Sequence, residues 1–418
     1  MSASPLGVAV VLENADMQAG MERQAHRLAR GLAARGARVV LVTTYTPAGF
    51  FHDAEREPAL LEPRDGYEIV RVLCRRWWSG EAVRALFARR LARELVTRSI
   101  DVVYGVQFQA ALHVRRVAKV SDWPLVLKLA CGGSYGDMAQ AAGRKDAAEV
   151  LEHLRHVDRY ACLSRQVESE VVAAGLPRER CVLVRNGVDR SIFAPEGAKA
   201  ELPRGKTVLF IGRHDRQKRV DVLVRAFAKV APTAPEARLV CAGKGSEEAN
   251  LRALAAELGV AERVSFLGER KDVPALLRAA SVFVLPSAAE GMPNALLEAL
   301  SVGVPCVATA IPGTTDVATD EREALLVPPD DEAALARAIE RLLVDGELAA
   351  RLSRAGRERI AAEFDMERVA DAHLALFESL RRPERAVDRS GLRALTRELA
   401  KTLVVGWFYA LGRRLRPS

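Results

Sequence analysis

The sequence lacks the features that organise several specialised classes of protein. Its six cysteines are scattered and never form a C-x-x-C pair, which argues against a disulfide framework or a zinc site and favours reduced thiols in a cytosolic compartment. No basic segment precedes the first apolar run, residues 6–11, and no cleavage-like site follows it. We therefore interpret this start as a first strand rather than a secretory signal peptide.

Neither a disordered nor a fibrous chain fits the composition. Apolar residues make up 49% and charged residues 28%, values typical of a soluble globular protein. A single hydrophobic core rarely organises a chain of 418 residues, so we expect two domains.

The positive charge is concentrated near the C-terminus. The net charge is +8, and residues 381–418 contain ten Lys and Arg against three Asp and Glu. The rest of the chain is therefore close to neutral, and no nucleic-acid motif accompanies the basic segment. We expect no nucleic-acid partner.

Short apolar runs alternate with longer amphipathic stretches, a pattern typical of βα units in a parallel sheet. Continuous Val, Ile and Leu runs indicate strands that are buried on both faces. In the first half the predicted strands are residues 7–12, 38–43, 68–73, 102–104, 125–129, 159–163 and 182–184, and the clearest helices are 21–35 and 81–98.

A second series of such units begins after a stretch rich in Pro, Gly and Lys, residues 194–206. Its predicted strands are residues 207–211, 238–242, 263–267, 282–285, 304–308 and 324–327, and its predicted helices include 219–230, 249–258, 273–279, 295–302 and 332–343. We expect an α/β protein with two Rossmann-like doubly wound domains, 1–195 and 196–365, facing each other across a cleft. Ligands of such sheets bind beyond the carboxyl ends of the strands.

The densest signal covers residues 285–300. A buried strand ends at Leu285, a loop carries Glu290 and Gly291, and Pro293 is expected at the first helical position. The start of this helix would present backbone N–H groups and the positive end of the helix dipole, which together suit a diphosphate.

Glu290 and Glu298 invite comparison with a glycosidase pair. Eight residues of helix span roughly 12 Å, beyond the about 5 to 9.5 Å that separates the carboxyl groups of a glycoside hydrolase. Separate tasks as acceptors of hydrogen bonds from hydroxyl groups fit better. The alternative is a capped helix with two surface carboxylates.

Arg213 and Lys218 follow the first strand of the second half. An arginine fork and a lysine point charge suit a diphosphate, and they would hold it more tightly as it leaves with developing charge. The alternative is an ordinary solvated loop.

Together these segments resemble the donor domain of the retaining family 4 glycosyltransferases, which have the GT-B fold. The spacing from Glu290 to Glu298 is similar to the E-x7-E motif of that family. The resemblance covers roughly residues 6–382 and also rests on residues 303–309, 312–313, 326–330, 211–213, 184–189 with Phe193, and 20–22.

The resemblance implies roles for individual residues. Glu290 would contact the transferred sugar, Glu298 the ribose, and the backbone of Gly291, Met292, Pro293 and Asn294 the phosphate or sugar groups. Gly20 and Asn186 would lie at the donor, and Arg270 near the base, although an exposed loop arginine is an equally good interpretation. The family retains the anomeric configuration and needs neither a protein nucleophile nor a metal, so we expect no cofactor.

This chain departs from the family in two places. Many relatives carry a histidine after the fifth strand of the first domain, where this sequence has alanine or cysteine ahead of Gly132, Gly133 and Asp137. The histidine's part in positioning the sugar would then be absent, or it would be taken over by the glycine-rich loop with Asp137. The usual Gly-Gly near the N-terminus is Ala19-Gly20.

Residues 366–382 resemble the closing helix of the family, which returns to the first domain. Beyond them, residues 383–418 combine leucines at helical spacing with a basic stripe, and the apolar run 402–411 is too short to span a bilayer. We expect an amphipathic helix on an anionic membrane surface through residues 384–418. A helix packed on the body or on a partner subunit is the alternative.

Residues 75–78 with the basic helix 81–98 are a second candidate membrane contact, for which core packing is an equally good explanation.

We therefore expect a cytoplasmic transferase, peripheral on the inner face of the cell membrane, that moves sugar from a nucleotide diphosphate sugar to a glycan or lipid-linked acceptor. An epimerase or phosphorylase on the same fold is one alternative, although no segment argues for the lysine that holds pyridoxal phosphate. A catalytically silent nucleotide-sugar-binding or scaffold subunit is another, kept open by the missing histidine.

Overall fold

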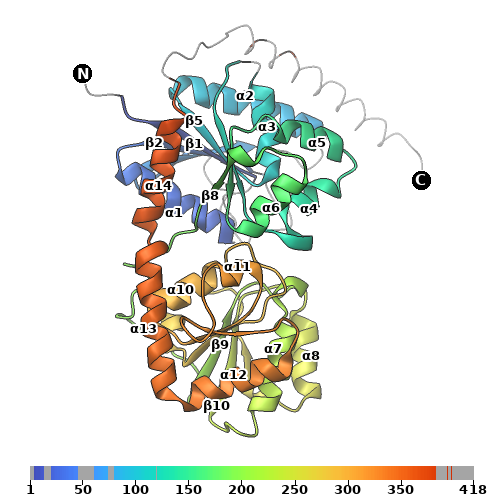
Figure 1. Ribbon diagram of the computed structural model, residues 1–418, viewed down its shortest axis with the longest axis vertical. Coiled ribbons are helices and arrows are strands. Elements are labelled where there is room, and N and C mark those ends of the chain that lie inside the picture. The colour runs from blue at the N-terminus through green and yellow to red at the C-terminus, as the bar shows by residue number, and fades with distance from the viewer. Residues whose placement is uncertain are drawn as a thin grey trace.

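The computed structural model describes residues 4–13, 20–45, 61–73, 80–118 and 120–382, with the single positions 393 and 397. Two α/β halves lie end to end, and a pair of long helices runs along one side of both (Figure 1). The predicted tail, residues 383–418, lies outside the described residues apart from those two positions, as do residues 75–78.

The first half contains a sheet of eight strands within the described residues. Its order is β3-β4-β2-β1-β5-β6-β7-β8, and every pairing is parallel except that of β3 with β4. The strands are β1 Gly7–Leu12, β2 Arg38–Tyr45, β3 Leu61–Arg64, β4 Tyr67–Leu73, β5 Val102–Val106, β6 Leu125–Leu129, β7 Arg159–Cys162 and β8 Cys181–Leu183. The sequence pattern missed β3, because this short edge strand is largely exposed and carries a proline rather than an apolar run.

The second half contains a parallel sheet of six described strands in the order β11-β10-β9-β12-β13-β14. They are β9 Lys206–Ile211, β10 Ala237–Ala242, β11 Val264–Phe266, β12 Val282–Leu285, β13 Cys306–Thr309 and β14 Leu325–Val327. In both halves the strand order reverses beside the first strand, which confirms two doubly wound sheets.

The described helices cover both faces of each sheet. They are α1 Gly20–Ala34, α2 Gly80–Thr97, α3 Phe108–Val117, α4 Asp137–Ala142, α5 Ala147–Leu154, α6 Arg165–Ala173, α7 Val220–Val230, α8 Glu248–Glu257, α9 Val273–Ala279, α10 Asn294–Val302, α11 Pro312–Thr315, α12 Glu332–Val344, α13 Gly346–Glu363 and α14 Met366–Ser379, with 3-10 turns η1 Gly133–Tyr135, η2 Arg178–Arg180, η3 Arg216–Lys218 and η4 Ala261–Arg263. None of the described helices is long and apolar enough to cross a membrane.

The hydrophobic core is divided by the first sheet. On one face, side chains of β1, β5 and β6 pack with α2 and α3 in a cluster that stays within the first half. On the other face they pack with α1 and α14 in a cluster that continues through the second half. One continuous apolar core therefore joins the two halves on the side of α14.

Helix α14 returns from the second half to the first (Figure 1). Gly31 of α1 lies against Ala370 so closely that a Cβ there would be 2.9 Å from the Ala370 Cβ. Arg35 binds the Glu367 carboxylate at 2.9 Å, and Arg382 beyond the helix binds Asp158 at 2.8 Å. The end of the described chain is thus anchored to the first half.

His373 ties α14 to the first sheet in a neutral form. Its Nδ1 lies 2.7 Å from the Val369 carbonyl oxygen and must carry the proton, so its Nε2 accepts from the Tyr104 hydroxyl at 3.3 Å. Burial lowers the pKa of His373 to about 4, and burial lowers the pKa of His113 to about 4 as well.

We expect the free energy of unfolding to fall as the pH drops from 6.5 towards 4. Between these pH values the histidines of the unfolded chain bind protons, whereas the buried histidines of the folded chain stay neutral. Their contribution to the free energy of unfolding is therefore fully present above pH 6.5 and is lost progressively below it. The loss at pH 5 is about 2 kcal/mol for each such histidine. Urea unfolding at pH 7 and at pH 5 gives the difference in the free energy of unfolding between the two pH values. We expect this difference to be smaller in His373→Phe. It should be unchanged in the control His156→Gln, which alters an exposed position. An equal difference in His373→Phe would contradict this assignment.

Candidate active site

The loop between β12 and α10 reaches the boundary between the two halves. The helix starts at Asn294, one residue later than expected, and Pro293 precedes it as the N-cap in an extended conformation (φ −74°, ψ 105°). No side chain caps this end of α10 in the described structure. Its first backbone N–H groups, with the positive end of the helix dipole, are therefore arranged for an anion.

An ion pair joins this loop to the loop after β9. Lys218 Nζ lies 2.6 Å from Glu290 Oε1, and the Ser287 hydroxyl donates to the same oxygen at 2.7 Å. The two charged side chains are only 17% and 8% exposed. The structure thus brings together Lys218, predicted at the diphosphate, and Glu290, predicted at the sugar. Their contact is short and poorly solvated, which makes the charge interaction strong.

Local hydrogen bonds hold Lys218 in place. Asp215 caps η3 by accepting from the Lys218 backbone N–H at 3.1 Å. The side-chain amide of the neighbouring Gln217 donates to the Ala289 carbonyl at 2.9 Å, and the backbone carbonyl of Gln217 accepts from the Ala288 N–H at 2.8 Å. The β9 and β12 loops therefore form one rigid unit.

Arg213 leaves the same β9 loop in a different environment. Its side chain is 62% exposed and pairs with Asp215 at 3.1 Å. It also lies near Glu22 of α1: burial raises the pKa of the Glu22 carboxyl, and the Arg213 charge opposes this rise. Arg213 is therefore a solvent-exposed cation close enough to the first half to interact with the charge of Glu22.

The glycine-rich loop of the first half closes against Gly291. A Cβ on Gly291 would lie 1.6 Å from the Ala130 carbonyl oxygen, so the backbones of the two halves touch at this point. Gly133 donates its N–H to Glu170 at 2.7 Å, and a Cβ on Gly132 would lie 3.0 Å from the same carboxylate. This contact places the loop beside Glu290.

Asp137 does not stand in for the missing histidine in the way we expected. It is 2% exposed, and its carboxylate accepts from the backbone N–H groups of Ala130 at 2.7 Å and Cys131 at 3.3 Å. Burial raises the pKa of Asp137 to about 6. Asp137 therefore braces the loop. The loop residue whose side chain interacts with the charges of both Glu290 and Lys218 is Cys131, whose thiol pKa is raised to about 12, mainly by burial.

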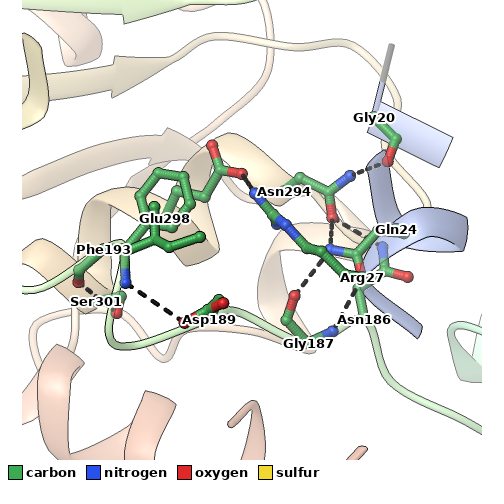
Figure 2. A network of polar contacts seen from close by, with 11 residues as sticks. Gly20, Gln24, Arg27, Asn186, Gly187, Asp189, Phe193, Asn294, Glu298 and Ser301 are labelled. Carbon is green, nitrogen blue, oxygen red and sulfur yellow. Dashed lines mark hydrogen bonds and ion pairs between the residues drawn. The ribbon is translucent and has the colours of Figure 1, made fainter. Parts of the chain in front are cut away.

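Asn294 is the centre of a polar network between the halves (Figure 2). Its side-chain oxygen accepts from Gln24 at 2.9 Å and from Asn186 at 3.0 Å, and its amide donates to the Gly20 carbonyl at 2.9 Å. Asn186 in turn accepts from the buried Lys128 Nζ at 2.7 Å and contacts Met292 through the Met292 carbonyl at 3.3 Å. The predicted residues Gly20, Asn186, Met292 and Asn294 thus gather at the start of α10.

Glu298 is fully buried, which the sequence pattern did not predict. Its Oε1 accepts from Arg27 Nη2 of α1 at 2.7 Å, and its side chain has no exposed surface (Figure 2). In this arrangement a ligand reaches Glu298 only after neighbouring groups have moved. Arg270, by contrast, lies on the loop after β11, forms a bidentate pair with Asp272 at 2.7 and 2.5 Å, and joins none of the network in Figure 2.

Gln24, Arg27 and Lys128 were missed from sequence. A signal was present for the first two, because they are polar residues on the face of α1 that otherwise buries Ala25, Leu28 and Leu32. Among the described residues no group of three or more His, Cys, Asp or Glu side chains lies together as a metal site would require.

We expect Gly291→Ala to separate the two halves, because its methyl group would overlap the Ala130 carbonyl. Amide hydrogen exchange over residues 130–137 should become roughly tenfold faster as this contact opens, and the radius of gyration from small-angle scattering should rise. Gly346→Ala, which meets no atom within 4 Å, is the matched control. Unchanged exchange in Gly291→Ala would show that the halves do not touch here.

Comparison with known proteins agrees with this geometry. The family model described as Glycosyltransferase Family 4 matches residues 19–192, and the model described as Glycosyl transferases group 1 matches residues 196–359. The chain is 32% identical to the lipopolysaccharide core biosynthesis glycosyltransferase LpsD of Rhizobium meliloti over 56% of this chain and 67% of that protein. It is equally similar, at 32%, to LpsE of the same organism over 55% of this chain and 66% of that protein.

Solved structures share the fold. Sucrose-phosphate synthase from Thermosynechococcus elongatus superposes with a TM-score of 0.74 at 23% identity, covering 90% of this chain and 99% of that one. Anabaena Alr3699/HepE, solved in complex with UDP and glucose, gives 0.72 at 16% identity over 90% and 100%. With two parallel-sheet domains, two matching family models and these relatives, the chain belongs to the group 1, family 4 glycosyltransferases of the GT-B fold.

Proposed function

We propose that this protein transfers a sugar from a nucleoside diphosphate sugar, with retention of configuration and without a metal, to a glycan or lipid-linked acceptor. The observation that carries the proposal is the ion pair of Lys218 with Glu290 beside the uncapped start of α10. It places a cation and a carboxylate, in contact with each other, on the loops beside the helix end that suits phosphate.

The leaving diphosphate would be held from two sides. Lys218 and Arg213 supply positive charge from the β9 loop, and the backbone N–H groups of α10 supply hydrogen bonds from the β12 loop. These contacts strengthen as negative charge develops on the leaving oxygen, which lowers the barrier. The relative HepE was solved with UDP and with UDP-glucose, which supports a nucleoside diphosphate as the ligand here.

The reaction that fits needs no protein nucleophile. The bond from the anomeric carbon to the phosphate oxygen breaks, the acceptor oxygen bonds to the same face, and the acceptor proton passes to the departing phosphate. Glu290, fixed by Lys218 and Ser287, would hold a sugar hydroxyl at the reacting end. The Cys131 loop, braced by Asp137, would close the site against water.

The acceptor is proposed from the relatives and from the sequence of the tail. LpsE and LpsD take their names from lipopolysaccharide core biosynthesis, which supports a cell-surface polysaccharide or glycolipid. Residues 384–418 carry basic and apolar side chains at helical spacing, which suits an anionic membrane surface on the cytoplasmic side. The transferase would then meet a lipid-linked acceptor at that surface.

Wild-type protein should be stabilised by one or more nucleotide-sugars and should hydrolyse that donor slowly. Glu290→Ala should lower turnover roughly 100-fold or more with little loss of binding, whereas Arg213→Ala and Lys218→Ala should weaken both. A panel of nucleotide-sugars, measured by thermal shift and by release of the diphosphate, tests this. Arg238→Ala, in β10 and bonded only to backbone carbonyls in the described residues, is the control.

The same panel separates the alternatives. If no nucleotide-sugar shifts the melting temperature, the proposed donor site is wrong. If nucleotide-sugars bind but none is turned over with any acceptor tried, the result favours a catalytically silent subunit. Retention is read from the anomeric configuration of the product by NMR, and turnover in excess EDTA should equal turnover without it. Inversion, or loss of activity with EDTA, would contradict the proposed mechanism.

A chain that ends at Pro383 should lose its binding to anionic vesicles. Each basic side chain near such a surface contributes about 1 kcal/mol, so removal of residues 384–418 should abolish sedimentation with phosphatidylserine vesicles. Neutral phosphatidylcholine vesicles serve as the control. Unchanged sedimentation of the shortened chain would assign the tail to packing or to a partner subunit.

A further inference from the structure

Two successive contacts between side chains join helices α1 and α10, which come from opposite halves (Figure 2). Gln24 binds Asn294 at 2.9 Å, and one turn further along both helices Arg27 binds Glu298 at 2.7 Å. The first contact holds the start of α10, and the second holds Glu298, the carboxylate that the family resemblance places at the ribose.

The second contact is a buried ion pair between domains. Arg27 is 9% exposed and Glu298 has no exposed surface, so the pair is shielded from bulk solvent. The Arg27 guanidinium also lies over the Phe193 ring at 5.1 Å, and Phe193 is held through its carbonyl by the Ser301 hydroxyl at 2.8 Å. The orientation of the Arg27 guanidinium is therefore set by α1, by α10 and by the segment that carries Phe193.

Each partner keeps one polar atom without a hydrogen bond. Glu298 Oε2 and Arg27 Nη1 are buried and have no partner among the described residues. A buried charged oxygen that lacks a donor is costly, and such atoms in native proteins usually have a ligand or water to complete them. A hydroxyl group, which donates to a carboxylate oxygen, fits Oε2.

We propose that Arg27 is a positioning residue of the donor site. It binds Oε1 of Glu298 from the opposite domain and leaves Oε2 as the acceptor for one ribose hydroxyl of the nucleotide. Because the two residues belong to different halves, the carboxylate takes up this orientation only when the halves are together, and the ribose enters before they close. This inference rests on the proposed function, since it assumes a nucleoside diphosphate in the site.

The experiment compares how ribose hydroxyls contribute to binding in two proteins. Dissociation constants of UDP, ADP and GDP are measured by calorimetry beside those of their 2′-deoxy and 3′-deoxy forms. In wild type, loss of the hydroxyl that binds Oε2 should weaken binding roughly 10- to 100-fold. In Arg27→Gln the ratio of the dissociation constant of the deoxy form to that of the ribo form should fall below about threefold. Arg27→Lys keeps the cation and should recover part of the wild-type ratio.

A purely structural role for Arg27 predicts a different result. In that case Arg27→Gln would weaken binding of the ribo and deoxy forms equally, and the ratio of their dissociation constants would stay as in wild type. An unchanged ratio would overturn the proposal, and so would a higher ratio. Arg30→Gln, on the exposed face of α1, is the matched control and should keep the wild-type ratio.

Two further outcomes complete the test. If Arg27→Gln does not fold, the double variant Arg27→Gln with Glu298→Gln leaves no charge buried, and its ratio must equal that of Glu298→Gln alone. A larger or smaller ratio in the double variant contradicts a role exerted through Glu298. If wild type binds none of the three diphosphates, the proposed function itself fails. If it binds them and the ratio is unaffected by Arg27, only this inference fails.

Discussion

The contact of Lys218 with Glu290 is the interaction on which the account of this protein depends. It joins the loop after β9 to the loop after β12, and both loops lie at the carboxyl edge of the second sheet, where doubly wound folds bind their ligands. The hydrogen bonds of Gln217 to Ala289 and Ala288 keep these loops in register. A cation, a carboxylate and a free helix start are thereby held together before any ligand arrives, which is the preorganisation that electrostatic catalysis requires.

The two halves meet at this site through polar as well as apolar contacts. Gly291 touches the loop of Ala130, Asn294 binds Gly20 and Asn186, and α14 carries the apolar core across to the first sheet. The first residue of α10 is also the hub of these bonds. On the proposed function, an anion at its backbone N–H would act on the same residue that joins the halves, so that binding and closure would be coupled.

The local sequence was sufficient for the buried strands of both sheets, but not for the exposed edge strand β3. Buried strands such as β1, β6 and β12 appear as unbroken apolar runs, and Glu290 and Lys218 were each singled out from motifs of recognisable spacing, although their contact was not predicted. What escaped prediction depends on contacts between distant segments. The partners of Glu298 and Asn186, which are Arg27 and Lys128, lie 271 and 58 residues away, and Asp137 turned inward because three backbone N–H groups nearby needed an acceptor. A helical pattern marks Gln24 and Arg27 as buried polar residues, but only the packed halves reveal what they bind.

A crystal structure of the protein with UDP bound tests the central claim most directly. The account predicts that the outer phosphate lies within about 3.2 Å of Lys218 Nζ and of the first backbone N–H groups of α10, with the Arg213 guanidinium turned towards it from solvent. A diphosphate bound elsewhere, with Lys218 still paired only to Glu290 and the start of α10 facing water, would contradict it.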